Sequence, residues 1–252
     1  MIPTGSLSGT FVVPITGDAV VERDENFTVV LSRPSSGAKI DRGTVRTTIT
    51  NDDVASTTTT NVIESAVSAT LGRDQTNLTL TGTGRINGTG NDAANVIRGN
   101  TAANRLAGRA GADELYGDAG DDQLQGDAGN DVLVGGEGRD RLLGGNGADQ
   151  FKFTQPTEGG DNISDFHASE GDKLAFVSQN FGGLAVGALT AANFSSSRYG
   201  VATTADQRFL FNTKSHLLKY DSDGNGAAAP VTIATLNGAS RLSADQIQIV
   251  AG

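Results

Sequence analysis

A nine-residue repeat in the middle of the chain restricts the possible folds more than any other feature of the sequence. In six consecutive units position 1 is Gly, and position 4 is Gly in five of them. Position 6 is Asp in five units and Asn in the first, while position 8 is Leu in five units and Phe in the last. One large apolar side chain in nine residues cannot be buried within a single unit. The pattern therefore predicts a solenoid whose units bury these side chains by stacking on one another.

The repeated positions can be located directly in the sequence. The units begin at Gly99, Gly108, Gly117, Gly126, Gly135 and Gly144. The glycines at position 4 are Gly111, Gly120, Gly129, Gly138 and Gly147. Position 6 is occupied by Asn104, Asp113, Asp122, Asp131, Asp140 and Asp149. Position 8 is occupied by Leu106, Leu115, Leu124, Leu133, Leu142 and Phe151. A degenerate unit, which begins at Gly90 and contains Asn95 and Ile97, precedes them.

The repeat also concentrates negative charge. Residues 108–149 carry ten Asp and Glu against three Arg, a net charge of −7 out of −10 for the whole chain. Burial of one Leu per unit contributes only about 2 kcal/mol, which is well below the entropic cost of ordering nine residues. Stacked units would also bring like charges together. A cation is therefore expected to be part of the fold.

Calcium suits these residues better than other metals do. It takes about six to eight oxygen ligands in flexible geometry, including backbone carbonyl groups. Gly at positions 1 and 4 allows tight turns that direct carbonyl groups inward, and Asp at position 6 supplies one carboxylate per unit. Magnesium demands a stricter octahedral geometry. Zinc prefers His or Cys, neither of which occurs in residues 99–152.

The units resemble the RTX, or hemolysin-type calcium-binding, repeat. Its pattern is G-G-x-G-x-D-x-U-x, where x is any residue and U is a large apolar residue. The resemblance implies a right-handed parallel β-roll in which the first six residues of a unit form a loop and the last three a strand. Calcium then lies between loops two units apart, held by the Asp at position 6 and by the loops of the glycines named above. The implied Asp pairs are Asp113 with Asp131, Asp122 with Asp140, and Asp131 with Asp149. Asn104 with Asp122 is expected to form a weaker site, and Asp149 to end the series.

The beginning of the chain resembles a different family. Residues 17–27 and 48–53 are similar to the second half of a Calx-beta domain. In that family acidic residues bind calcium, so the candidate ligands here are Glu22, Asp52 and Asp53. A solvated acidic surface is the alternative. The first half of such a domain is absent, which predicts that the chain is the C-terminal piece of a longer protein.

The end of the chain resembles the β-rich region that follows the roll in type I-secreted proteins. Residues 209–212 and 217–226 are similar to a recurrent terminal hairpin, and Asp245 precedes an apolar tail typical of an uncleaved secretion signal. Secretion machinery is thus an expected partner. A stack of repeats also needs a cap on its exposed end, and this region is predicted to provide one.

Changes in composition along the chain predict four segments, all of them in an all-β protein. Residues 1–53 form the partial Calx-beta segment, and residues 54–76, which are rich in Ser and Thr, form a linker. Residues 77–152 form the β-roll. Residues 153–252 form the C-terminal cap and secretion region.

Several other motifs are incomplete. Asp221 and Asp223 match the start of an EF-hand loop, but position 12 is Thr232 where a bidentate Glu is needed, so a plain turn is preferred. The H-x-x-E of residues 167–170 lacks a second His. No phosphate-binding or nucleophile motif is matched. We therefore expect that the chain is not an enzyme.

Composition narrows the partners further. An acidic chain with an isoelectric point near 4.6 is a poor candidate for binding nucleic acid, and no apolar run is long enough to span a membrane. The sequence predicts a secreted or cell-surface module for calcium binding, calcium-dependent folding and type I secretion. Two alternatives stay open. The chain is a segment of a surface adhesin with an unknown target, or the tail of a secreted hydrolase whose catalytic domain lies elsewhere.

Overall fold

The computed structural model describes residues 25–30, 44–49 and 62–252, which fall into two compact units. In the first unit β1 (Glu25–Val30) and β2 (Thr44–Ile49) pair in antiparallel fashion. The candidate calcium ligands Glu22, Asp52 and Asp53 lie outside the described residues. The Calx-beta resemblance of this segment therefore stays a prediction.

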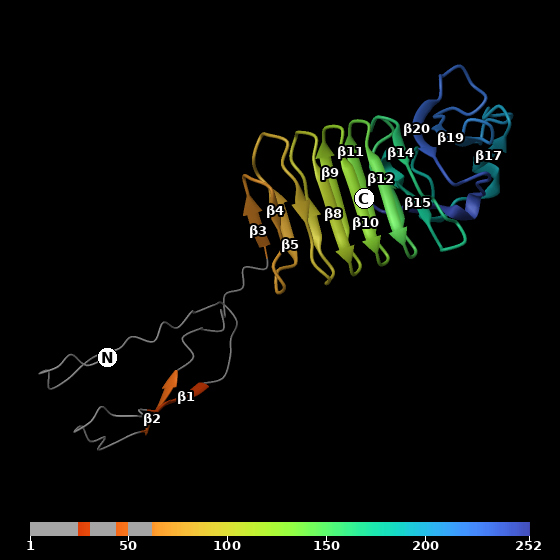
Figure 1. Cartoon of the computed structure of the whole chain (residues 1–252). Helices are drawn as coiled ribbons and strands as arrows, with labels where there is room; N and C mark the ends of the chain where they lie inside the picture. Colours follow the sequence, from red (N-terminus) through yellow and green to blue (C-terminus); the bar gives the residue numbers. More distant parts are fainter. Residues whose placement is uncertain (1–24, 31–43, 50–61) are drawn as a thin grey trace, which may run out of the picture. The chain divides into compact units, whose positions relative to one another are not determined.

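The second unit is a β-roll in which two sheets face each other across a shared core (Figure 1). Successive strands of the repeat alternate between the sheets, so that strands two units apart are hydrogen-bonded neighbours. Within residues 62–252, the nine-stranded sheet contains β3 (Val62–Ser65), β5 (Asn77–Leu80), β7 (Val96–Arg98), β9 (Glu114–Ala119), β11 (Val132–Glu137), β13 (Gln150–Phe153), β15 (Lys173–Val177), β16 (Gly187–Ala188) and β21 (Ile247–Val250). The ten-stranded sheet contains β4 (Ala69–Thr70), β6 (Gly88–Thr89), β8 (Arg105–Ala110), β10 (Gln123–Ala128), β12 (Arg141–Asn146), β14 (Asp161–Ile163), β17 (Phe194–Ser197), β18 (Phe209–Asn212), β19 (Leu217–Tyr220) and β20 (Val231–Leu236).

Position 8 of every repeat lies in this core. Because side chains alternate between the two faces of a strand, the residue at position 8 points inward while its neighbours at positions 7 and 9 point outward. The parallel register stacks equivalent residues on each other, for example Leu106, Leu124 and Leu142 in the ten-stranded sheet. The six position 8 side chains are at most 2% exposed. The predicted apolar column is confirmed.

The strands are longer than the RTX resemblance implies. Strand β10 covers positions 7 to 9 of one unit and continues through positions 1 to 3 of the next. Asp127 and Ala128, at positions 2 and 3, pair with Gly145 and Asn146 two units later. The expected division into six loop residues and three strand residues is therefore wrong, because parallel pairing continues beyond the apolar position. Below, "loop segment" means positions 1 to 6 of a unit.

The roll begins before the repeat does. Strands β3 and β4 lie within residues 62–70, in the segment that was predicted to be a linker, and they pair in parallel with β5 and β6. The Ser and Thr residues of the predicted linker concealed these two short strands, which belong to the roll because they pair with β5 and β6. Residues 54–61, the rest of the predicted linker, lie outside the described part of the chain.

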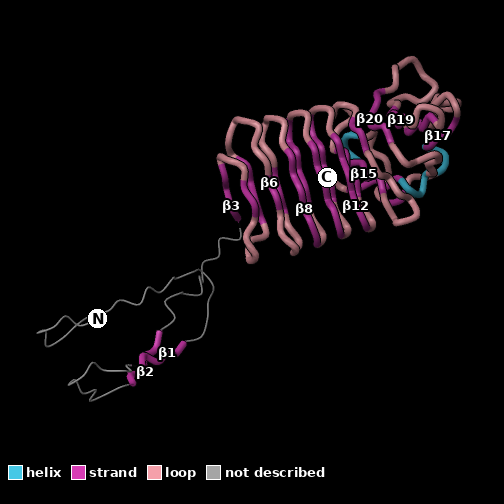
Figure 2. The backbone as a smooth tube through the Cα atoms, in the orientation of Figure 1, coloured by secondary structure: helices cyan, strands magenta, loops and turns pink. Residues whose placement is uncertain are grey.

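At the other end the sheets continue past the repeat. Strands β15 and β21 extend the nine-stranded sheet, and β14 and β20 extend the ten-stranded one, all in parallel. Figure 2 shows β15 and β20 after β12 along the roll. An aromatic cluster closes the core, with the rings of Phe176 and Phe209 4.5 Å apart between centroids. Strands β18 and β19 form the predicted antiparallel hairpin. Three short 3-10 helices complete the described region, η1 (Ser178–Asn180), η2 (Ala191–Asn193) and η3 (Ala244–Gln246).

The predicted fold class, an all-β parallel roll, is confirmed. Among the residues that the structure describes, no helix has the length and hydropathy needed to cross a membrane.

Candidate calcium-binding loops

Loop segments two units apart are joined by the side chains at position 6. In each case one carboxylate oxygen, Oδ1, accepts a hydrogen bond from the backbone N–H of position 6 two units earlier. Oδ1 of Asp131, for example, accepts from the N–H of Asp113 at 2.8 Å, and Oδ1 of Asp140 accepts from the N–H of Asp122 at 2.8 Å. Asp149 accepts from Asp131 at 2.9 Å. The structure therefore brings together all three Asp pairs that the sequence predicts.

The second carboxylate oxygen of these residues, Oδ2, is buried and unpaired. Among the side chains that the structure describes, six buried oxygen atoms have no hydrogen-bond partner. Five of them are Oδ2 atoms at position 6, those of Asp113, Asp122, Asp131, Asp140 and Asp149. These residues are each only 1% exposed. A buried anionic oxygen without a donor is strongly unfavourable, so each of the five is a candidate ligand for a cation.

Position 1 is glycine because Oδ2 lies against its α-carbon. A methyl group on Gly108 would collide with Oδ2 of Asp113 and lie 2.8 Å from the carbonyl oxygen of Gly126. The same arrangement recurs at Gly117, Gly126, Gly135 and Gly144, where a methyl group would collide with Oδ2 of the same unit. These glycines do not have a positive φ. Their role is to leave space for oxygen atoms, whereas the sequence suggested a tight turn.

Position 4 is glycine for a conformational reason. Gly111, Gly120 and Gly129 have φ values of 107°, 118° and 146°, and Gly138 and Gly147 have φ values of 142° and 132°. This region of φ is rarely adopted by residues with a side chain. The turn it produces is the one that the sequence predicted.

Backbone carbonyl groups enter the gap between paired loop segments from both sides. The carbonyl oxygens at positions 2 and 4 of one unit, such as those of Asp118 and Gly120, lie against the α-carbons of Gly136 and Gly138 two units later. The carbonyl oxygen at position 1 of the later unit lies against the position 1 glycine of the earlier unit. At Gly117, for example, the carbonyl oxygen of Gly135 and Oδ2 of Asp122 both lie close to the α-carbon. Within the described residues, no cluster of three or more His, Cys, Asp or Glu side chains could hold a metal. A donor set of two carboxylates and several carbonyl groups suits calcium.

Burial raises the pKa values of the position 6 carboxyl groups. The pKa is raised to about 7 for Asp113 and to about 7 for Asp122, chiefly because the charged form loses its hydration, and secondarily because other Asp residues lie nearby. The pKa is raised to about 6 for Asp140 and for Asp149 for the same reason. A cation in the gap acts in the opposite direction, since it stabilises the carboxylate.

The sequence predicted that the series of paired Asp residues ends at Asp149, but the series continues beyond it. Oδ1 of Asp161 accepts from the N–H of Asp140 at 3.0 Å, and Oδ1 of Asp172 accepts from the N–H of Asp149 at 3.0 Å. Asp161 and Asp172 are 1% and 3% exposed. Gly159 has a φ of 77° and lies against the carbonyl oxygen of Gly138, so it occupies position 4 of this later loop. The altered spacing, 21 and 23 residues where the repeat has 18, concealed both residues.

The weaker pair that was predicted for Asn104 is also formed. The N–H of Asn104 donates to Oδ1 of Asp122 at 2.7 Å, and the N–H of Asn95 donates to Oδ1 of Asp113 at 2.7 Å. In both pairs the earlier unit supplies a carboxamide where later pairs have a carboxylate. A single carboxylate then faces each of these two gaps.

The EF-hand-like segment has the hydrogen bonds of a turn. Oδ1 of Asp221 accepts from the N–H groups of Asp223 and Gly224 at 3.2 and 3.1 Å. Asp223 in turn accepts from the N–H of Ala228 at 3.0 Å. These bonds are those of a local Asx turn.

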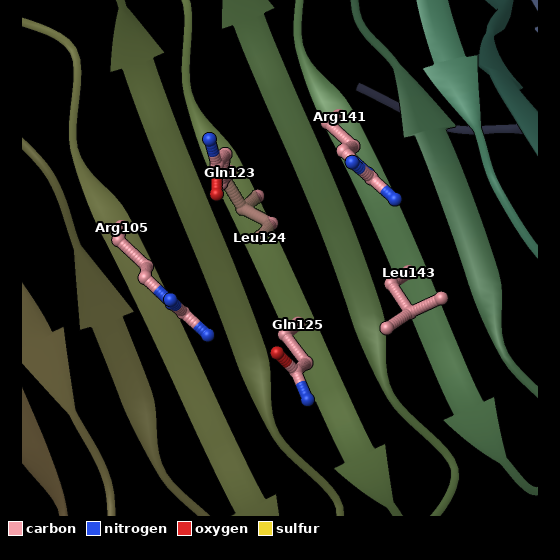
Figure 3. Close-up of a pocket in the computed structure, with 6 residues that line it drawn as sticks. All are labelled: Arg105, Gln123, Leu124, Gln125, Arg141 and Leu143. Carbon is pink, nitrogen blue, oxygen red and sulfur yellow. The ribbon is translucent and has the colours of Figure 1, made fainter.

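A shallow depression lies on the outer face of the ten-stranded sheet (Figure 3). It has a volume of about 250 Å³ and is lined by Arg105, Gln123, Leu124, Gln125, Arg141 and Leu143. Apart from Leu124, whose side chain is buried in the core, these side chains come from β8, β10 and β12 and lie in rows across the strands. The depression holds no acidic side chain, so it is distinct from the candidate calcium-binding loops.

Residues 89–124 and 116–151 match the family model described as the RTX calcium-binding nonapeptide repeat in four copies. The predicted resemblance to RTX repeats is thereby confirmed, and calcium is the ion that such repeats bind. The fold and the loop segments together define a parallel β-roll with calcium-binding repeats.

A search of curated proteins gives no match. Among solved structures, the chain is similar to the solution structure of the AlgE6R3 subunit of a mannuronan C5-epimerase from Azotobacter vinelandii. The two are 29% identical, and the match covers 62% of this chain and 78% of that one, with a TM-score of 0.28.

Proposed function

We propose that this chain is a calcium-dependent folding module of a larger bacterial protein that acts outside the cell. The observation that carries the proposal is the series of five buried, unpaired Oδ2 atoms at position 6 of successive units. Each belongs to a gap that is also lined by backbone carbonyl groups. Without a cation these gaps oppose folding, and with one they hold neighbouring turns together.

The residues that would hold the ions follow from the loop geometry. In each gap the two position 6 carboxylates and the carbonyl groups of positions 1, 2 and 4 supply oxygen ligands. Calcium supplies the positive charge that the loop segments lack. Asp161 and Asp172 extend the series, so five gaps contain two carboxylates each. Metal binding in such a fold contributes directly to the free energy of folding.

The expected calcium affinity determines in which compartment the roll can fold. Extracellular calcium modules typically bind with dissociation constants of about 10⁻⁴–10⁻³ M, so the loops would stay empty in a cytosol that is low in free calcium. In the folded roll, the apolar tail is strand β21, and its side chains Ile247 and Ile249 are at most 1% exposed. Secretion machinery that recognises this tail would have to bind it before the roll forms. Calcium outside the cell then completes folding, and no catalytic role is assigned to the chain.

Circular dichroism of the full chain tests the proposal. In chelator we expect little β-structure from the roll, with a cooperative gain when calcium reaches millimolar concentration and no comparable gain with magnesium. A spectrum that is fully β-structured in chelator and unchanged by calcium would refute calcium-dependent folding.

A further inference from the structure

The first units of the roll contain buried asparagine side chains in the places where later units need a cation. We propose that Asn100 and Asn104 exclude calcium from the gap between loop segments 81–86 and 99–104, because their amide NH2 groups bind the carbonyl groups that face it. Asn91 does the same one unit earlier. This end of the roll would then fold without calcium and form a template for the units that follow. The inference rests on the proposed function, since it divides the roll into calcium-free and calcium-dependent parts.

The hydrogen bonds of Asn100 carry the argument. Its Nδ2 donates to the carbonyl oxygens of Gly82 at 2.5 Å and Gly84 at 3.0 Å. These are positions 2 and 4 of loop segment 81–86, the positions whose carbonyl groups face the gap in later units. Nδ2 of Asn104 donates to the carbonyl oxygen of Ile86 at 2.7 Å. Two neutral amides thus satisfy three carbonyl groups of the earlier loop segment.

The side-chain oxygen atoms at position 6 also differ between the first units and the later ones. Oδ1 of Asn104 lies against the α-carbon of Gly99, as Oδ2 of each later Asp lies against its own position 1. Oδ1 of Asn104 nevertheless accepts from the N–H of Asn100 at 2.8 Å, whereas the later Oδ2 atoms have no partner. The loop is therefore complete without an ion.

The backbone explains why the later loops lack this donor. Position 2 has a positive φ in later units, with values of 87° at Arg109, 72° at Asp118 and 77° at Asp127. Asn91 and Asn100, at the equivalent position, do not have a positive φ. A different backbone conformation at position 2 orients the N–H toward the side chain at position 6 in the first units only.

The preceding unit repeats the arrangement. Nδ2 of Asn91 donates to the carbonyl oxygens of Gly72 and Gln75 at 2.6 Å each. Oδ1 of Asn95 accepts from the N–H of Asn91 at 2.7 Å. The four asparagines of these two units are at most 8% exposed.

The charge of the two parts of the roll agrees with this division. Residues 72–107 carry four Arg against two Asp, a net charge of +2, while residues 108–149 have a net charge of −7. The first part therefore has no excess of negative charge to neutralise. Its last two units also donate the N–H groups of Asn95 and Asn104 to Asp113 and Asp122, which places the first calcium-binding carboxylates.

Hydrogen exchange of the full chain in chelator tests the inference. We expect amides of residues 77–107 to exchange at least about ten-fold more slowly than those of residues 108–149, and calcium to slow the second group selectively. Equally fast exchange in both segments would overturn the inference. Strong protection of both segments in chelator would instead refute the proposed function, so the two failures are distinguishable.

A double variant tests the role of the asparagines. Asn100→Gly with Asn104→Asp gives this unit the residues of a later one and places a second carboxylate beside that of Asp122. We expect it to bind one more calcium ion than the wild-type chain by titration calorimetry, in the gap between loop segments 99–104 and 117–122. It should also lose protection of residues 81–107 in chelator. The matched control is Thr101→Gly with Asn87→Asp, which introduces one Gly and one Asp at exposed positions nearby and should leave both readouts unchanged. A double variant with wild-type protection of residues 81–107 in chelator would overturn the inference. If the double variant does not fold, the exchange contrast of the wild-type chain decides.

Discussion

Replacement of Asp131 by Asn removes one carboxylate from two of the proposed calcium sites at once. Oδ1 of Asp131 faces the gap to Asp113, where it accepts a hydrogen bond at 2.8 Å, while its unpaired Oδ2 faces the gap to the unit of Asp149. Asn has the same shape but no charge. Hydrogen bonds to charged groups contribute about 1.5–3 kcal/mol to stability, and hydrogen bonds between neutral groups contribute about 0.5–1.5 kcal/mol. A loss of roughly 1–2 kcal/mol at each of two sites corresponds to about 5–30-fold weaker calcium binding there.

Calorimetric titration of Asp131→Asn against Asp127→Asn measures this effect. The control removes one negative charge from the same unit, but Asp127 is a strand residue at position 2, outside the pairs of position 6 carboxylates. We expect two weakened sites in Asp131→Asn and near-wild-type binding in Asp127→Asn. Equal weakening in both variants would show that only net charge matters and would refute the loop assignment. Because Asp149 also contacts two gaps, Asp149→Asn should weaken binding as much as Asp131→Asn does.

Three further outcomes follow from the structure. Gly108→Ala should weaken calcium binding because its methyl group would collide with Oδ2 of Asp113. Gly84→Ala is the control, because the space around Gly84 is open. Equal calcium affinities of the two variants by calorimetry would contradict this role of Gly108. In chelator, β-structure measured by circular dichroism should increase as the pH falls from about 8 to about 5. The pKa of Asp113 is raised from 3.8 to about 7 in the metal-free fold, so protonation of this carboxyl group stabilises that fold. The stabilisation is lost as the pH rises through about 7. A chelator spectrum independent of pH would refute this linkage. Leu124→Ala should lower the free energy of unfolding by about 2–5 kcal/mol in urea titrations with calcium, without changing the number of bound ions; a loss below about 1 kcal/mol would show that position 8 does not support the core.

Much of the roll could be predicted from the repeat, because its period fixes both the apolar column and the pairing of units 18 residues apart. The pairs of Asp113, Asp122 and Asp131 with their later partners follow from that spacing alone. Asp161 and Asp172 could not be found in this way, since longer connections shift them out of period while the strands on either side stay in register.

The role of the Asn side chains in the first units could not be predicted from the sequence either. A sequence shows that Asn104 replaces Asp, which predicts a weaker calcium site. It does not show that the side chain of Asn100 reaches the carbonyl groups of Gly82 and Gly84. Such bonds depend on the backbone conformation at position 2, which no pattern of residue types specifies. The strands in residues 62–70 were not predicted because the segment from residue 54 to residue 76 is rich in Ser and Thr, and the strands that pair with β3 and β4 lie later in the chain.

A crystal structure of the full chain grown in millimolar calcium, with anomalous scattering to identify the ions, tests the central claim most directly. We expect calcium in the five gaps that contain the unpaired Oδ2 atoms of Asp113, Asp122, Asp131, Asp140 and Asp149. We expect none between loop segments 81–86 and 99–104, where amide groups bind the carbonyl oxygens. A structure in which the five gaps hold no ion, with the roll folded as described, would contradict the account.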